Sequence, residues 1–250
     1  MATTEKITYC RICEPLCGLV ATVEDGRITG VRGDKDNPLS QGFCCVKSEA
    51  MVDVVYDSDR VLQPLRRNAS GDGFTTTGWD QAQSDIAARL CRIIAEHGPE
   101  SVAVMHGNPP GFNYSSLLAL EGFQKAIGTP YKYGVNAEDA ASRMAANAIL
   151  YGNPAIMLRP DFWNTDFALI LGSNLYISHG SLVTEPRLRE ALKGIVERGG
   201  RVVVVDPRRT ETARQFEHLP IRAGSDGWLL AAVIRELLAV PIRDQVFLDR

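Results

Sequence analysis

The sequence predicts an α/β protein in which a small irregular domain with β-strands, residues 1–60, precedes a doubly wound, mostly parallel αβα sheet domain, residues 61–250. Three observations predict this arrangement. Five of the six cysteines stand within the first 45 residues. From Trp79 onward, short apolar segments alternate with longer segments of helical periodicity. Such alternation is typical of a parallel sheet with helices on its faces.

A β-hairpin is expected in the first domain. The segments 18–24 and 27–32 alternate in polarity and flank Asp25-Gly26, a dipeptide that favours a two-residue turn. The polar loop 33–38 follows. A chain reversal in this loop would bring Cys45 back toward the cysteines of the segment 10–17.

The second domain is expected to alternate helices and strands. Apolar residues at helical spacing predict helices at 80–96, 115–127, 140–151, 185–198 and 226–239. Short apolar runs predict strands at 101–105, 167–171 and 201–205. Strands this apolar are typical of burial on both faces of a parallel sheet. Cys91, in the first of these helices, is expected to be a small buried hydrophobic residue.

The bulk composition narrows the class of protein. With 45% hydrophobic and 23% charged residues, the 250-residue chain has the composition of a globular protein rather than a disordered one. A formal net charge of −3 gives no general attraction to nucleic acid or to an anionic membrane. No apolar run is long enough to span a bilayer, and residues 1–6 carry no signal-peptide core, so we expect a cytoplasmic protein.

The cysteines indicate a metal centre. Cys10, Cys13 and Cys17 place three thiolates in one tight loop, and a fourth ligand has to return from Cys44 or Cys45. Three ligands plus one favour a [4Fe–4S] cluster. Structural zinc sites usually use two separated pairs, so a zinc-stabilised binding module is the lesser alternative. Adjacent extended residues point to opposite sides, so only one of the last two cysteines is expected to bind, and the other to be a small buried hydrophobic residue.

These residues resemble a known family. The segment 10–18, CRICEPLCG, is similar to the start of the dimethyl sulfoxide reductase family of molybdopterin oxidoreductases, which includes formate dehydrogenases and nitrate reductases. The segment 42–47, GFCCVK, resembles the family's Gly-x-x-Cys-x-Lys motif, and this register implies Cys45 as the fourth cluster ligand. Weaker matches continue at 24–27, 33–34, 59–62, 78–80, 166–174, 205–208 and 223–226. The resemblance also implies that Lys47 lies between cluster and pterin as an electron relay.

A molybdopterin guanine dinucleotide cofactor with molybdenum or tungsten is a second implication of the resemblance. Loops at the carboxyl ends of parallel strands suit its pyrophosphate and ribose, because backbone N–H groups face the anion there. The candidate binding residues are Gly172, Ser173, Asn174, Asp206, Arg208 and Asp226. Asp226 is equally a candidate N-cap of the helix 226–239, and Arg208 is equally a candidate for a solvated loop residue.

A protein ligand to the molybdenum or tungsten is implied near the start of the helix 140–151, which ends in Tyr151-Gly152. The family's usual spacing from such an aromatic–glycine pair reaches Asp139, and a carboxylate is a suitable hard ligand. Ser142 is a second candidate. Asp139 as the N-cap of this helix is an equally good interpretation.

The implied function is redox catalysis in which a [4Fe–4S] cluster relays electrons to or from a pterin-bound metal, as in formate dehydrogenases. Family enzymes are far longer than 250 residues. We therefore expect an incomplete sheet domain, an isolated chain without activity, and partners in the form of further segments or of another subunit. An electron-transfer partner, such as a ferredoxin, a flavin subunit or an iron–sulfur subunit, is also implied. The alternative is a non-catalytic electron-transfer module similar to the complex I subunit that has lost the metal cofactor.

Overall fold

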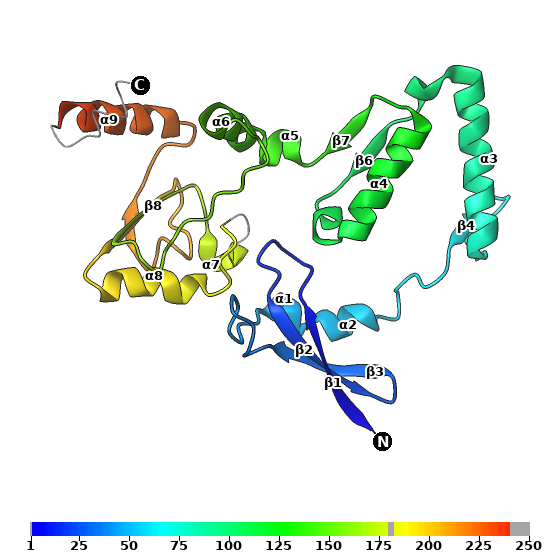
Figure 1. The fold of residues 1–250 in the computed structure, drawn as a ribbon, viewed down its shortest axis with the longest axis horizontal. Helices are drawn as coiled ribbons and strands as arrows, with labels where there is room; N and C mark the ends of the chain where they lie inside the picture. Colours follow the sequence, from blue (N-terminus) through cyan, green and yellow to red (C-terminus); the bar gives the residue numbers. More distant parts are fainter. Residues whose placement is uncertain (1, 180–182, 241–250) are drawn as a thin grey trace. The chain divides into compact units, whose positions relative to one another are not determined.

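The structure is a computed structural model that describes residues 2–179 and 183–240. The chain divides into two compact units, Met1–Leu158 and Arg159–Arg250, and Figure 1 labels most of their helices and strands. The part of the expected second domain beyond residue 240 lies outside the described residues. None of the helices in the described ranges is long and apolar enough to cross a membrane.

The first unit begins with an antiparallel sheet of three strands, β1 (Thr3–Tyr9), β2 (Gly18–Glu24) and β3 (Arg27–Gly33), in the order β1-β2-β3. The predicted hairpin is confirmed. Asp25 and Gly26 connect β2 and β3 with φ angles of 49° and 78°, the left-handed pair that a tight two-residue turn requires. The sequence did not predict β1, whose side chains are exposed throughout.

Two short helices, α1 (Val46–Glu49) and α2 (Met51–Val55), pack against β3. Met51 also packs against a small buried core of Cys10, Cys17 and Leu19. Two of these three core residues are cysteines that the sequence predicts as metal ligands. The packing of this region therefore includes two of the predicted metal ligands.

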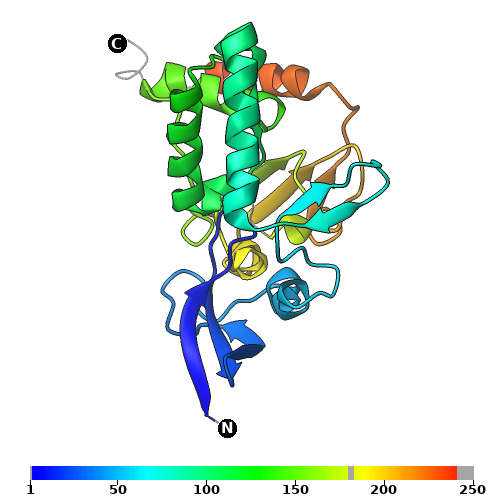
Figure 2. The ribbon, with the colours of Figure 1, turned by 90° about the vertical axis from the view of Figure 1, so that its right-hand side faces the viewer.

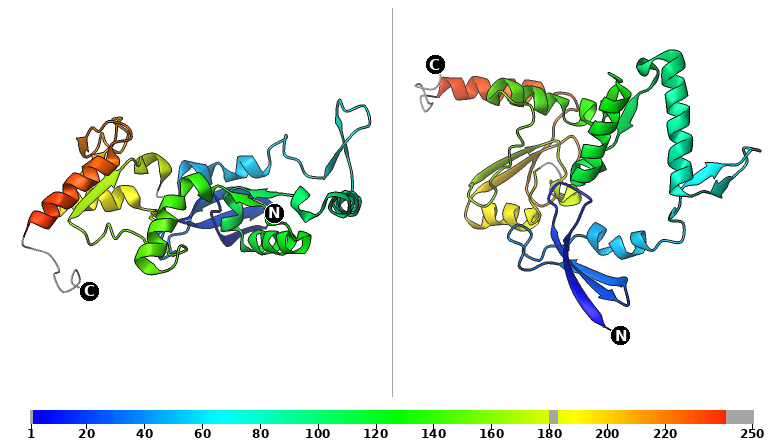
Figure 3. Two further views of the ribbon diagram at one scale, coloured as in Figure 1. Left: turned by 90° about the horizontal axis from the view of Figure 1, so that it is seen from above. Right: turned by 45° about the vertical axis from the view of Figure 1, so that its right-hand side comes forward.

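The rest of the first unit contains a hairpin, a parallel strand pair and several helices. The elements are β4 (Leu65–Arg67), β5 (Phe74–Thr76), α3 (Trp79–His97), β6 (Val104–His106), α4 (Tyr114–Ile127), β7 (Lys132–Gly134), α5 (Asn136–Asp139) and α6 (Ala141–Tyr151). β4 and β5 form an antiparallel hairpin, cyan in Figure 3, whereas β6 and β7 pair in parallel. The predicted helices are confirmed, and α4 ends at Gly128 with a φ of 77°.

In this region one predicted strand is present with shifted bounds, and one expectation is wrong. The strand predicted at 101–105 begins only at Val104, because Pro99–Ser101 forms a 3-10 turn. Cys91 is exposed on α3 rather than buried. Within the described residues α3 has no buried side chain, so a cysteine on it gains no apolar environment.

The second unit is built on a parallel sheet. Its strands β8 (Phe167–Leu171), β9 (Arg201–Val205) and β10 (Glu217–Leu219) lie in the order β10-β9-β8. Two helices, α7 (Leu175–Ser178) and α8 (Leu188–Glu197), come between β8 and β9, and α9 (Asp226–Ala239) follows β10. Figure 2 shows this sheet in yellow to orange, with α8 seen end-on. Leu192 and Ile195 of α8 pack with Ile170 and Val204 in the buried core.

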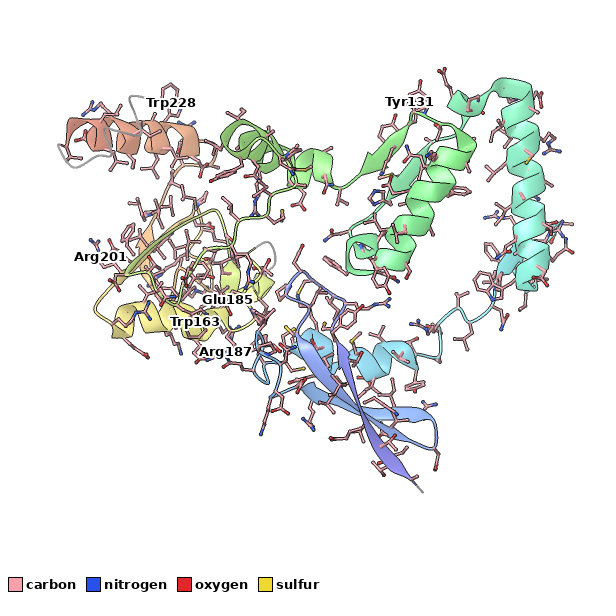
Figure 4. All side chains as sticks on the ribbon, in the orientation of Figure 1. Tyr131, Trp163, Glu185, Arg187, Arg201 and Trp228 are labelled. Carbon is pink, nitrogen blue, oxygen red and sulfur yellow. The ribbon has the colours of Figure 1, made fainter. Side chains whose placement is uncertain are left out.

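The helix α8 begins three residues later than predicted. Glu185 is buried, and its carboxylate accepts hydrogen bonds from Trp163 Nε1 and from the backbone N–H of Arg187, both at 3.0 Å. The Arg187 guanidinium lies 4.6 Å from the centre of the Trp163 ring, so the three labelled side chains gather in Figure 4. Residues 185–187 are therefore held as a turn against Trp163 instead of forming a helical turn.

The α/β class with a small strand-rich domain first is confirmed. Parallel pairing is confirmed as well, in β6–β7 and in β8–β10. The strands of the described residues form four sheets, two parallel and two antiparallel. The expected αβα sheet thus takes the form of two small parallel sheets, one in each unit.

Candidate metal centre and strand-end edge

The first three cysteines occupy the loop between β1 and β2. Tyr9 and Gly18 are paired at the end of the β1–β2 ladder, so the loop is closed at its base. The backbone N–H of Cys10 donates to the carbonyl of Cys17 at 2.8 Å. Cys10 and Cys17 are buried and Cys13 is half-buried. One short, closed loop therefore carries two buried thiols and one half-buried thiol.

The chain returns to this loop through residues 33–42. The backbone N–H of Asp34 donates to Gly18 O at 2.9 Å, and the N–H of Gly42 donates to Asp34 O at 2.7 Å. A Cβ on Gly33 would collide with the carbonyl oxygen of Gly42, so only glycine permits this close approach. The reversal predicted for the polar loop is thereby confirmed, and it delivers Cys45 to the region of the first three cysteines.

The link between the two segments is Ser48 of α1, which is 1% exposed. Its hydroxyl donates to Sγ of Cys10 at 3.3 Å. The Sγ of Cys45 lies 3.8 Å from the same oxygen. Sequence reasoning missed Ser48, because nothing in the pattern around it distinguishes this serine from a surface one.

The thiols act on one another electrostatically. Burial raises the pKa of Cys13 to about 11, with further upward contributions from Cys10, Glu14 and Cys45. Burial likewise raises the pKa of Cys17 to about 12, and the other cysteines of the set contribute in the same direction. When these thiols are deprotonated, their negative charges repel one another. A positive centre among them is needed to offset this repulsion. An iron–sulfur cluster, which binds deprotonated thiolates, fits this donor set.

The two adjacent cysteines differ in their surroundings. Cys44 packs with Val31 and Phe43 against the buried core, and burial raises its pKa. Cys45 raises the pKa of both Cys13 and Cys17, whereas Cys44 contributes to neither. Cys45 is thus electrostatically coupled to Cys13 and Cys17. Cys45 and Cys10 also raise the pKa of Cys44, which differs from Cys45 in packing against the apolar core.

Across the described ranges 2–179 and 183–240, no group of three or more His, Cys, Asp or Glu side chains is positioned to hold a metal ion.

Lys47 lies on α1, two residues after Cys45, and its side chain is exposed. Its ammonium group lowers the pKa of Cys13, the largest effect on that thiol after burial. A positive charge therefore stands beside the half-buried cysteine of the loop. This position agrees with the cation that the motif implies next to the metal centre.

The carboxyl ends of β8 and β9 form a second candidate region. Leu171 and Val205 are register partners, and the backbone N–H of Gly172 donates to Val205 O at 2.9 Å. The loops that begin with Gly172 and Asp206 therefore start side by side, as expected for parallel strands. Gly172 has a φ of 60°, in the left-handed region that favours glycine.

Asn174 connects these two loops. Its Oδ1 accepts hydrogen bonds from the backbone N–H and the hydroxyl of Thr212, and its Nδ2 donates to Glu211 at 2.6 Å. Hydrogen bonds from the segment after β9 thus fix the position of Asn174 in the segment after β8. The sequence pointed to Asn174 but not to its partner Glu211. The two residues are 37 positions apart, so no local pattern connects them.

The charged candidates of this edge differ in their contacts. Asp206 is half-buried, and its Oδ1 accepts the backbone N–H of Arg208 at 2.8 Å. The Arg208 side chain is exposed, with its guanidinium 3.5 Å from the carboxylate of Glu211. Ser173 is half-buried. Asp226 is exposed, and the N-cap of α9 is Ser225, so the interpretation of Asp226 as N-cap is wrong.

Two buried hydroxyls stand next to this edge. Tyr176 Oη and Ser178 Oγ, both in α7, have no hydrogen-bond partner within the described part of the chain. Buried polar groups normally bond to protein, water or ligand. The Tyr176 ring belongs to the buried core and packs edge-on against Phe216, so its hydroxyl lies in the interior of the second unit.

The candidate metal ligands Asp139 and Ser142 are both exposed. Asp139 is the last residue of α5, and the N-cap of α6 is Ala140. The interpretation of Asp139 as N-cap of this helix is therefore wrong.

Comparison with known proteins agrees with these sites. A family model described as molybdopterin oxidoreductase Fe4S4 domain matches residues 3–57, and one described as molybdopterin oxidoreductase matches residues 60–240. The chain is 30% identical over 247 residues to a nitrate reductase of Symbiobacterium thermophilum, covering 97% of this chain and 32% of that protein. It is also 30% identical over 253 residues to a sulfite dehydrogenase polypeptide of Allochromatium vinosum, covering 98% of this chain and 25% of that protein.

A solved structure gives the same picture. Acetylene hydratase from Pelobacter acetylenicus matches with a TM-score of 0.81 and 27% sequence identity, over 98% of this chain and 33% of that one. The chain thus spans a third or less of the length of these three proteins.

Proposed function

The chain belongs to the molybdopterin oxidoreductase family, with the family's Fe4S4 domain at its N-terminal end, and from this premise we propose that it holds the cluster of a molybdenum or tungsten enzyme and binds the dinucleotide of the pterin. The single observation that carries the proposal is the convergence of two distant segments. The closed loop 10–17 and the segment that returns through Gly33 and Gly42 meet around buried thiols.

The proposed cluster ligands are Cys10, Cys13, Cys17 and Cys45, within a cluster-binding domain of residues 1–60. When bound, a [4Fe–4S] cluster supplies one-electron transfer. The chain holds the thiolates in place, and the burial of Cys10 and Cys17 excludes water from that side of the site. The coupling of Cys45 with Cys13 and Cys17 supports it, rather than Cys44, as the fourth ligand.

Lys47 is proposed to serve the electron relay between cluster and pterin. Its ammonium acts on Cys13, and a positive charge there stabilises the extra negative charge of a reduced cluster. The side chain is exposed in this chain, so it is free to face a second bound group. Its role is that of a charge held at a defined place, not of a ligand.

The pterin dinucleotide is proposed to bind along the strand-end edge of residues 61–250. The residues concerned are Gly172, Ser173, Asn174, Asp206, Arg208 and Asp226. Carboxylates at 206 and 226 can accept hydrogen bonds from ribose or guanine, and Arg208 can donate to a phosphate.

The reaction of the complete enzyme is a further part of the proposal. The names of its relatives include a nitrate reductase, a sulfite dehydrogenase and an acetylene hydratase, so family membership does not select a substrate. A formate dehydrogenase-like oxidation is the reaction expected from the sequence. We propose a cytoplasmic enzyme with Asp139 as candidate metal ligand. Further segments or a second subunit would complete it, and an electron-transfer partner would exchange electrons with it.

Metal and cofactor analysis of the anaerobically purified protein tests the proposal. About four irons per chain with equivalent acid-labile sulfide, together with molybdenum or tungsten and pterin, is the expected result. Iron and sulfide without pterin would point to the electron-transfer module instead. Stoichiometric zinc without iron or sulfide would refute the cluster and leave a zinc-stabilised binding module.

A further inference from the structure

Ser48 occupies a place that the ligand set does not explain. It is 1% exposed, and its backbone N–H donates to Cys45 O at 2.9 Å within the first turn of α1. Its hydroxyl lies between the two segments that carry the cysteines, 3.3 Å from Cys10 Sγ and 3.8 Å from Cys45 Sγ. A side-chain hydrogen bond from Ser48 also lowers the pKa of Cys44. The serine is thus fixed by its helix with its oxygen near two of the four proposed ligand sulfurs and near the thiol of Cys44.

Metal binding decides which way this hydroxyl points. Between an uncharged thiol and a hydroxyl, either group can donate the hydrogen bond. In the contact between Cys45 and Ser48, either atom can therefore be the donor. A metal-bound thiolate has no proton and can only accept. Ser48 has a single O–H, so it can serve one sulfur at a time. The O–H points to Cys10, which has the shorter of the two measured contacts and is a proposed ligand, whereas Cys44 can keep its own proton.

A donor at this sulfur affects the energy of reduction. Reduction adds negative charge to the cluster, and part of this charge resides on the cysteine sulfurs. An O–H dipole directed at a sulfur stabilises the reduced state more than the oxidised state, which raises the reduction potential. Because Ser48 is buried, solvent screens its dipole far less than it screens the charge of the exposed Lys47.

We propose that Ser48 is a positioning residue whose hydroxyl donates to the Cys10 thiolate and raises the reduction potential of the bound cluster. The inference rests on the proposed function, since it requires Cys10 to be a cluster ligand. It adds a second determinant of the potential that is independent of the charge at Lys47.

The test compares Ser48→Ala and Ser48→Thr in the complete purified protein. Redox-monitored EPR gives the potential, and resonance Raman gives the iron–cysteine stretching frequencies. Ser48→Ala should retain iron and sulfide, shift the potential downward and raise an iron–cysteine frequency, because the sulfur loses a hydrogen bond. Ser48→Thr retains the hydroxyl and should restore both values. Ser40→Ala is the matched control, because Ser40 is 0% exposed and its hydroxyl bonds to Gly18 and Asn37.

Each outcome is informative. An unchanged potential and Raman spectrum in Ser48→Ala, or an equal shift in Ser40→Ala, would overturn the inference while leaving the ligand set intact. Where Ser48→Ala loses its iron, Ser48→Thr decides. A wild-type cluster in Ser48→Thr then supports the role of the hydroxyl, and loss of iron in Ser48→Thr as well overturns that role. A wild-type protein without iron would instead refute the proposed function.

Discussion

The amide of Asn174 holds Thr212 by two hydrogen bonds: Oδ1 accepts from the backbone N–H at 3.2 Å and from the hydroxyl at 2.9 Å. Thr212 is 0% exposed, and its Oγ1 also accepts the backbone N–H of Tyr176 at 2.9 Å. The loops after β8 and β9 are therefore joined by one buried polar network, 38 residues apart in sequence. The candidate pterin edge is therefore held together by hydrogen bonds within the chain itself.

Loss of this amide should loosen the edge. Asn174→Ala leaves the buried hydroxyl and N–H of Thr212 without their acceptor, at an expected cost of about 1–3 kcal/mol. Hydrogen exchange, measured by mass spectrometry, should become faster in peptides covering 172–178 and 210–213. Asn174→Asp retains an acceptor and should perturb exchange less. Wild-type exchange in the alanine variant would show that the network does not stabilise the edge.

The two adjacent cysteines should respond differently to the same substitution. Cys45→Ser should abolish or degrade the cluster, because it replaces a proposed ligand. Cys44→Ser should leave iron and sulfide largely intact, because that thiol packs against apolar side chains. Iron, sulfide and EPR signal of the two variants give the comparison. Equal loss in both would mean that the register of the motif is misread.

Removal of the charge at Lys47 should affect electron transfer without removing a ligand. In Lys47→Ala the iron content should stay unchanged. The potential of the cluster should fall, because the reduced state loses a nearby positive charge, and turnover of the complete enzyme should decrease. Lys47→Arg keeps the charge and serves as the control. Unchanged potential and turnover in the alanine variant would identify Lys47 as an ordinary surface lysine.

The iron-free protein should be less stable in alkaline solution. The pKa values of Cys13 and Cys17 are about 11 and 12 when folded, mainly through burial, against about 8.5 for an unfolded cysteine. Above about pH 9 the unfolded chain therefore loses protons that the folded chain keeps. The free energy of unfolding then falls as pH rises toward the folded pKa values.

Urea unfolding of the chelator-treated protein at pH 8 and pH 10 measures this effect, followed by the fluorescence of a reporter placed in the first unit. The midpoint should be lower at pH 10. Cys17→Ala removes one of the titrating thiols and should reduce the difference between the two pH values. A midpoint that is independent of pH would contradict the buried position of these thiols.

The sequence by itself determined the features whose physical cause is local. Asp25-Gly26 fixed the hairpin, because few other dipeptides adopt two consecutive left-handed conformations at low cost. The strands β8 and β9 and the helix α9 have the bounds that apolar periodicity predicts. The crowded cysteines identified the metal centre and the family, since ligand identity and spacing are properties of the chain itself.

Only the tertiary structure decided the features that depend on distant partners. The polar, exposed strand β1 carries no apolar pattern that predicts a strand. It forms because its backbone pairs with that of β2. Asp139 and Asp226 look like N-caps in the sequence, but the neighbouring residues take those positions. Ser48 reads as an ordinary polar residue until the fold places it against Cys10, from 38 residues away. Hydrogen bonds across such separations depend on how the chain is folded, and no window of the sequence contains both partners.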